Sequence, residues 1–186
     1  MPSKANQWEK FYEKAWNPAN FSAEKSKVYV QDAYNTMTHA IQLVADLVGA
    51  EVEIVVTKDA SKSISGRFPY LETADGTVIS ESEAILKHIC RQNENSGLLG
   101  KNPFEQAKIN EWIAWTQTSW LPKMHPASFA IFGYGKPDGD KFTNDVKAMK
   151  EASKILDGYL KGKTWLVGDS FSLADIFVGS CMLSSF

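Results

Sequence analysis

Apolar positions along this chain recur with two rhythms, one typical of strands and one typical of helices. Short runs of β-branched and aromatic residues over 27–32 and 51–56 indicate strands. Between them, apolar residues recur every three or four positions over 38–48, which predicts a helix that ends at Gly49. A strand, a helix and a second strand in this order predict two parallel strands joined by a right-handed crossover.

A hairpin and another helix follow this unit. The segments 68–72 and 77–79 flank Asp75-Gly76, a dipeptide that favours a tight hairpin turn. Ser82 is placed to cap the next helix, in which apolar residues at helical spacing face inward. We therefore expect these elements to form one small α/β domain.

The second half of the chain has the helical rhythm throughout. Asn102 is a favourable cap for a long helix, with Pro103 at its first position and Glu105 at its third. In chain order we expect a linker over 93–101, helix breaks at Leu121-Pro122 and His125-Pro126, a loop over 129–140, a helix over 144–161 and a last helix from Ser172. The predicted domains are an extension over 1–26, the α/β domain over 27–92 and a helical domain over 102–186.

The last helix begins with several helix-start signals together. Ser172 and Asp175 have the spacing of a capping box, in which each side chain bonds the backbone N–H of the other. Phe171 and Ile176 flank this box as a hydrophobic staple. Apolar residues occupy most of the circumference beyond the box, so we expect this helix to run through the centre of the helical domain.

Residues 1–26 have a pattern of their own. Aromatic residues recur there at helical spacing until Asn17-Pro18, namely Trp8, Phe11, Tyr12 and Trp16. Two interpretations stay open: a short amphipathic helix packed on its own domain, or a helix that docks into a groove of a partner. Trp115 lies off the main apolar face of the helix that Asn102 opens, and it is a further candidate anchor for docking.

The composition is that of a globular protein, with 44% hydrophobic and 23% charged residues. Twenty basic against 22 acidic residues leave a net charge of −2, so no overall positive field attracts nucleic acid. No apolar run reaches the roughly 18 residues that a membrane span requires. Cys90 and Cys181 lie far apart in predicted helices, which favours buried thiols in a reducing compartment. We expect a cytoplasmic protein without a membrane partner.

Residues with candidate chemistry are sparse. The histidines, His39, His88 and His125, are dispersed and have no cysteine or carboxylate at metal-ligand spacing, so we expect no metal site. The sequence contains neither a Gly-rich phosphate loop after a strand nor the elbow motif of a serine nucleophile.

Two stretches of sequence resemble a known family. Leu166-Val167-Gly168-Asp169-Ser170, followed by the capping box, resembles the start of the buried helix of glutathione-transferase-like proteins, and the segments 68–71 and 79–85 resemble the end of their thioredoxin-like domain. Within this group the chain is most similar to the gamma subunit of translation elongation factor 1B, over roughly residues 27–186. The resemblance implies an α/β plus all-α fold, in which a thioredoxin-like N-terminal domain precedes an all-helical glutathione-transferase C-terminal domain. We expect the chain to be a fragment that is truncated at its end.

The resemblance also implies where glutathione would bind. Phe68 and Pro69 match the cis-proline turn of the family, and Glu81 and Ser82 match its acidic residue and serine at a helix start. Tyr34, in the loop after the first strand, is the candidate to donate a hydrogen bond to the thiolate, although a packing role stays open.

One departure from the family weakens this site. The ten residues 58–67 stand where catalytic relatives have a loop, a helix and a second loop that hold the glycine end of glutathione. Connecting loops alone take about 4–6 residues each, so part of the pocket wall is expected to be absent. We therefore assign no catalytic residue and expect no cofactor, with glutathione binding as the alternative.

For function, the resemblance implies a non-catalytic assembly domain of the elongation factor 1B complex that binds the nucleotide-exchange subunit. Two alternatives stay open, an adaptor domain of an aminoacyl-tRNA synthetase complex and an active glutathione transferase. Expected partners are the other subunits of elongation factor 1B or the synthetases, with a homodimer as a further option.

Overall fold

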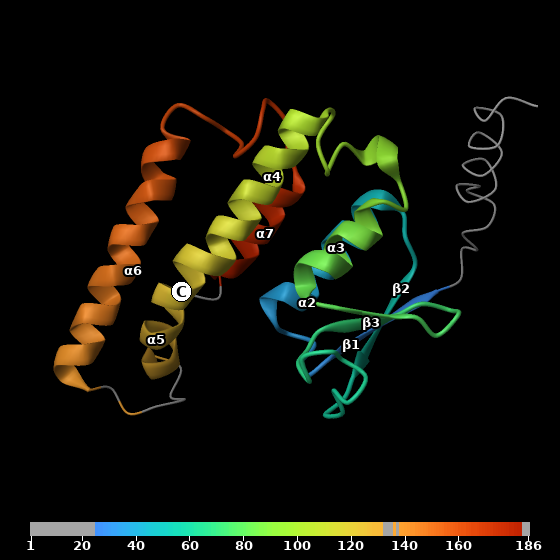
Figure 1. Cartoon of the computed structure of the whole chain (residues 1–186), viewed down its shortest axis with the longest axis horizontal. Coiled ribbons are helices and arrows are strands. Elements are labelled where there is room, and N and C mark those ends of the chain that lie inside the picture. Colours follow the sequence, from blue (N-terminus) through green and yellow to red (C-terminus); the bar gives the residue numbers. More distant parts are fainter. Residues whose placement is uncertain (1–24, 132–135, 137, 184–186) are drawn as a thin grey trace, which may run out of the picture.

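The structure, a computed structural model, describes residues 25–131, 136 and 138–183. Its N-terminal part is a four-stranded sheet with two helices on one face (Figure 1). The elements are β1 (Ser26–Val30), α2 (Thr36–Val48), β2 (Val52–Val56), β3 (Tyr70–Glu72), β4 (Val78–Ser80) and α3 (Ser82–Cys90). The strand order is β2-β1-β3-β4, with β1 and β2 parallel and the other pairs antiparallel. The predicted parallel pair and the predicted hairpin are both confirmed.

Alternation along β1 separates the two faces of this sheet. Val28 and Val30 are buried in the core with the helices, so Tyr29 between them points to the opposite face. The antiparallel register sets Tyr29 opposite Tyr70 of β3, and their rings stack with centroids 4.6 Å apart. The face without helices therefore has aromatic rings at its centre.

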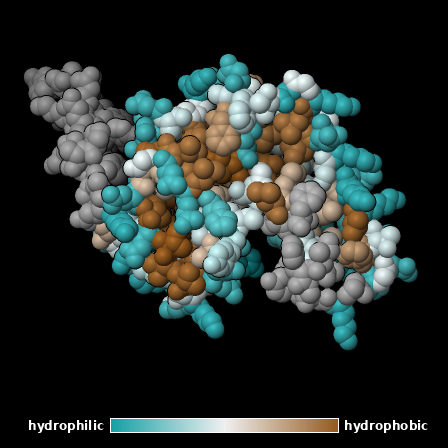
Figure 2. Space-filling model, turned by 180° about the vertical axis from the view of Figure 1, so that it is seen from behind, coloured by the Kyte–Doolittle hydropathy of each residue, from teal (hydrophilic) through white to brown (hydrophobic). Residues whose placement is uncertain are grey.

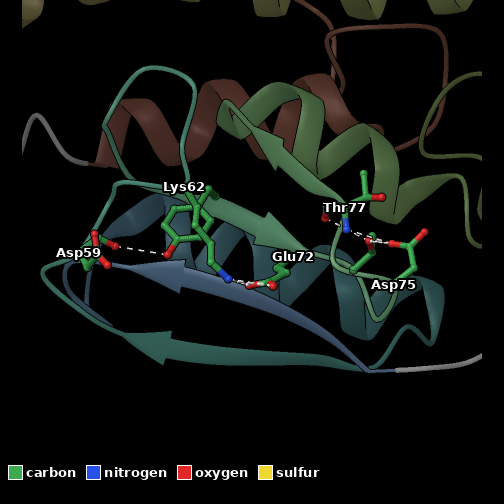
Figure 3. Close-up of polar contacts among 7 residues, drawn as sticks. Asp59, Lys62, Glu72, Asp75 and Thr77 are labelled. Atoms are coloured by element: carbon green, nitrogen blue, oxygen red, sulfur yellow. Dashed lines mark hydrogen bonds and ion pairs between the residues drawn. The ribbon is translucent and has the colours of Figure 1, made fainter.

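Local signals set the ends of α2 and of the hairpin. The Asn35 side chain caps α2 by accepting from the backbone N–H of Met37 at 2.8 Å, and Gly49 ends the helix with a φ of 73°. In the hairpin turn, Asp75 accepts from the Thr73 hydroxyl at 2.5 Å and from the Thr77 N–H at 3.0 Å (Figure 3). These two donors hold the pKa of Asp75 below its ordinary value.

The second part of the described chain is helical. Its elements are η2 (Glu94–Ser96), α4 (Pro103–Trp115), the π-helical turn η3 (Thr116–Trp120), α5 (Leu121–Ile131), α6 (Gly139–Leu160) and α7 (Leu173–Leu183). Helices α5 and α6 lie side by side, and α7 contacts both α4 and α2 (Figure 1). One continuous hydrophobic core joins the two parts, with Leu173 and Phe177 of α7 inside it. The buried position predicted for this helix is confirmed.

Predictions about the middle of the helical part are wrong in two places. The breaks predicted at Leu121-Pro122 and His125-Pro126 do not occur, because α5 continues to Ile131 with Pro126 inside it. Pro122 lies in the first turn of α5, directly after the wider π turn, where the proline ring and the missing N–H are more easily accommodated. Helix α6 begins at Gly139, earlier than predicted, so the predicted loop over 129–140 is shortened at both ends.

Candidate functional site

The sheet register brings the predicted glutathione positions to one end of the sheet. Tyr70 of β3 pairs with both Tyr29 and Ser80, so the end of β1, the start of β3 and the end of β4 lie side by side. The candidates in the segments next to these strand ends are Tyr34, Phe68, Pro69, Glu81 and Ser82. The tertiary structure therefore gathers residues that lie up to 48 positions apart in the sequence.

The start of α3 differs from its prediction. Ser82 is the first residue of the helix and Glu81 takes the cap position, so the prediction that Ser82 caps this helix is wrong. Among the described residues, Glu81 is the one non-glycine residue with a positive φ, 73°, a strained conformation that costs about 1–3 kcal/mol. The N–H groups of the first turn have no acceptor inside the helix and favour an anion at its end.

The other candidates are placed as follows. The Phe68–Pro69 peptide bond is cis, and the Phe68 ring stacks on Tyr70 with centroids 6.0 Å apart. The Tyr34 side chain is 85% exposed, and its backbone N–H donates to the Asp32 carboxylate at 2.9 Å. No described residue hydrogen-bonds the Tyr34 hydroxyl, so nothing in the described chain orients this group toward a thiol.

The segment 57–69 joins β2 to β3 without a helix and covers the sheet face opposite α2 and α3. Three residue pairs hold it there. Lys62 Nζ lies 2.9 and 2.8 Å from the two carboxylate oxygens of Glu72. The Ile64 N–H donates to the Ser80 hydroxyl at 3.1 Å, and the Tyr70 hydroxyl donates to the Asp59 carbonyl at 3.3 Å. Figure 3 shows Asp59 and Lys62 beside this face. Tyr70 is only 3% exposed as a result. The sequence showed that this segment is short, but not that it is held against the sheet.

The charges on this face follow from these contacts. The hydrogen bond from Lys62 holds the pKa of Glu72 below its ordinary value, and the same bond raises the pKa of Lys62. Burial raises the pKa values of Tyr29 and Tyr70. The face around Tyr70 therefore carries an ion pair and neutral phenols at physiological pH.

Two hollows in the described surface lie away from the candidate residues. One, of about 350 Å³, lies between the end of α3 and the start of α4, and its lining includes Arg91 and Gln106. The other, of about 160 Å³, lies beside β1 and the hairpin turn. None of the five candidates lines either hollow.

The start of α7 contains part of the predicted capping box. Asp175 Oδ2 accepts from both the backbone N–H and the hydroxyl of Ser172, each at 2.9 Å, while the Asp175 N–H donates to the Ser172 carbonyl rather than to its hydroxyl. Asp175 Oδ1 accepts from the Leu166 N–H at 2.9 Å, a contact that the sequence did not suggest. Phe171 packs edge-on against Trp165, and Ile176 is buried. This carboxylate therefore joins the preceding loop to the helix start.

Of the predicted docking residues, only Trp115 lies in the described chain. It is half-buried and packs edge-on against Trp112, which packs in turn against Tyr159 of α6. Trp8, Phe11, Tyr12 and Trp16 lie outside the described residues, as does nearly all of the predicted extension over 1–26.

Comparison with known protein families gives two matches along this chain. Residues 27–91 match the N-terminal domain of glutathione S-transferases, and residues 112–183 match their C-terminal domain. The glutathione S-transferase-like protein LUC7 of Fusarium sp is 30% identical over 162 residues, which are 82% of this chain and 74% of that protein. The chain belongs to the glutathione S-transferase family.

Other similarities within and beyond this family bear on fold and function. A solved glutathione S-transferase from Pseudomonas fluorescens has a TM-score of 0.75 at 25% identity, over 86% of this chain and 84% of that one. The thioredoxin-like domain followed by a helical transferase domain is thereby confirmed. Elongation factor 1-gamma of Artemia salina is 31% identical over 118 residues, 63% of this chain but 26% of that factor. The chain thus spans about a quarter of the elongation factor and is similar at nearly equal identity to a transferase-like protein.

The described residues contain neither a cluster of metal ligands nor a helix that could span a membrane. Among the residues that the structure describes, no three His, Cys, Asp or Glu side chains come together as metal ligands. Within the same part of the chain, no helix has the length and apolar character needed to cross a bilayer.

Proposed function

We propose that this chain is a non-catalytic assembly domain of the glutathione S-transferase family. The observation that carries the proposal is the short segment 57–69. Its polar groups bond the sheet through Lys62, Ile64 and Asp59, and it contains no helix. In catalytic relatives, as the resemblance implies, this region supplies a helix that holds one end of glutathione.

The arrangement of the other candidates supports the same proposal. A hydroxyl that activates a thiol must be held within hydrogen-bond reach of the sulfur. Tyr34 is 85% exposed and has no described partner that would hold it there. The remaining parts of the site, a cis-proline turn and a helix start, also serve the fold alone.

The similarity to elongation factor 1-gamma suggests the partner. We propose that the chain binds the nucleotide-exchange subunit of the elongation factor 1B complex through surfaces of both domains. An adaptor role in an aminoacyl-tRNA synthetase complex is the nearest alternative, because it requires the same fold and no catalysis. A stable contact of this kind buries about 1,200–2,000 Å² in total.

An active glutathione transferase is the second candidate function. It is favoured by the N–H groups of the α3 start beside Ser82, which have no acceptor inside the helix, and by the similarity to the Fusarium transferase-like protein. A γ-glutamyl carboxylate would fit the positive end of this helix.

One experiment separates catalysis from assembly. Glutathione is titrated into the chain by calorimetry, and turnover of chlorodinitrobenzene with glutathione is measured for the wild type, Tyr34→Phe and Ser82→Ala. We expect no binding heat and no rate above the uncatalysed reaction in any of them. Turnover by the wild type that Tyr34→Phe abolishes would show that the chain is a transferase.

A second experiment tests the partner. The immobilised chain is exposed to cell extract and the retained proteins are identified by mass spectrometry, with Trp115→Ala as the test variant. Phe104→Ala is the matched control, because Phe104 is an exposed aromatic residue of the same helix α4. We expect retention of the exchange subunit, reduced by the Trp115 change and not by the control. Retention of synthetases instead would favour the adaptor alternative.

A further inference from the structure

The outer edge of β2 presents backbone groups that no described residue uses. β2 is the first strand in the sheet order and pairs with β1 alone. The Thr57 N–H donates to the Val30 carbonyl at 2.9 Å, which shows that every second residue of this strand faces β1. The residues whose N–H and C=O groups face away from β1 are therefore Val52, Ile54 and Val56.

Within the described part of the chain, this edge lacks the usual protection against strand pairing. Natural edge strands carry proline, lysine or a bulge, or are covered by a loop. The sequence of β2 is Val-Glu-Ile-Val-Val. The three residues whose backbone groups face away from β1 are all β-branched, and Val56 is 58% exposed. Glu53, the one charged residue of the strand, directs its N–H toward β1.

We propose that β2 pairs antiparallel with β2 of a second copy of this chain, about a two-fold axis through Ile54. The two four-stranded sheets would then form one continuous sheet. This interaction surface is separate from the proposed function and holds for either of its candidates.

The sequence of the strand complements itself in this register. Ile54 lies opposite Ile54 of the second copy, and Val52 lies opposite Val56, so the hydrogen-bonded pairs are all apolar and β-branched. Glu53 lies opposite Val55, so no carboxylate faces another. Just beyond the strand, Lys58 falls near Glu51 of the second copy, where the opposite charges attract.

Neighbouring registers are less favourable. An axis through Glu53 sets two carboxylates directly opposite each other, which is destabilising. An axis through Val55 sets Val52 opposite Lys58 and leaves fewer strand residues paired. A shift by an odd number of residues turns the hydrogen-bonding groups away from each other. The axis through Ile54 is thus the register that the strand itself selects.

The contact between the two β2 strands is small, so we expect the dimer to be weak. A single strand pair buries less than the roughly 1,200 Å² of a standard stable interface, so we expect a reversible dimer that forms at micromolar or higher concentration. The outward N–H groups should then be protected from hydrogen exchange only when the chain is concentrated.

The test follows individual amides of the full chain by NMR hydrogen exchange at high and low protein concentration. Sedimentation at the same concentrations reports the oligomeric state. We expect the N–H groups of Ile54 and Val56 to gain protection with concentration, while those of Glu53 and Val55, which face β1, are protected throughout. Outward amides that exchange freely while the chain is dimeric would place the dimer elsewhere and overturn the proposal.

A pair of variants adds a second readout. Val56→Lys introduces a lysine opposite Val52 of the second copy and should raise the dissociation constant on the order of tenfold. Ile64→Lys is the matched control, since Ile64 is 90% exposed on the segment 57–69, and it should leave the constant unchanged. A wild type that stays monomeric overturns the proposal, as does protection that is independent of concentration, because β2 would then pair within its own chain.

Discussion

Asp175 is the residue whose replacement tests the structure most sharply. Its carboxylate accepts three hydrogen bonds at 2.9 Å, two from the N–H and hydroxyl of Ser172 and one from the N–H of Leu166. It therefore holds the start of α7 and the loop before it in one arrangement. Because α7 joins the two halves of the hydrophobic core, we expect this carboxylate to affect the stability of the whole chain.

Asp175→Asn keeps the shape of the side chain and removes its charge. An amide has one acceptor oxygen, so its NH₂ group must face at least one of the three donors. The variant loses a hydrogen bond to a charged group, worth about 1.5–3 kcal/mol, and leaves a donor without an acceptor, which costs about 1–3 kcal/mol. Since Asp175 is only partly buried, we expect a total near the lower end, about 2–3 kcal/mol.

Urea unfolding followed by tryptophan fluorescence measures this loss. The control is Asp169→Asn in the same loop, because the Asp169 side chain is 91% exposed and pairs with Lys101 at 3.3 Å. An exposed pair of this kind contributes about 0–1 kcal/mol. A loss for Asp175→Asn that is below about 0.5 kcal/mol, or equal to that of the control, would refute the role assigned to this carboxylate.

Three further predictions concern the covered sheet face and the thiols. Tyr70→Phe removes the bond to the Asp59 carbonyl and should lower the free energy of unfolding by about 0.5–1.5 kcal/mol in urea titrations; an unchanged value would contradict the contact. The pKa of Glu72 is lower in the folded chain than its ordinary 4.5, so the stabilisation by Lys62 is present above pH 4.5 and is lost as the pH falls through the lower folded value. Lys62→Met should abolish that part of the acid dependence, and a variant with the wild-type profile below pH 4.5 would argue against it. Burial raises the pKa values of Cys90 and Cys181 to about 12, so a thiol reagent should label them only on unfolding; rapid labelling of the native chain would show that they are accessible.

The proposed assembly role and the proposed edge pairing place function on surfaces. The segment 57–69 lies on one face of the sheet, and β2 forms one of its edges. Figure 2 shows a broad apolar area on the side of the molecule that lies behind in Figure 1. Both proposals therefore depend on which surfaces are covered in the assembled protein, and the experiments above measure that directly.

Much of the fold could be predicted because its signals are local. The end of α2 at Gly49 and the turn at Asp75-Gly76 depend on the backbone preferences of one or two residues. The buried position of α7 follows from apolar residues around most of its circumference. Each of these features is decided within a few positions of the chain, so the sequence alone was sufficient.

The errors occur where local signals and tertiary packing disagree. Pro126 predicts a break, but α5, which contains it, stays continuous to Ile131 and packs along α6, so tertiary context overrides the local preference. Ser82 has the preferred residue type for a cap, but β4 ends at Ser80 and leaves Glu81 as the single residue that turns the chain into α3.

The sequence by itself determined most of the strands and helices, the family that they resemble and the positions that a glutathione site would use. The tertiary structure alone decided that Lys62 meets Glu72, that Asp175 reaches Leu166 and that no described strand pairs with the outer edge of β2. The physical reason is that these contacts join residues whose side chains have many possible partners of equal chemistry. Only the packing of the whole chain selects among those partners.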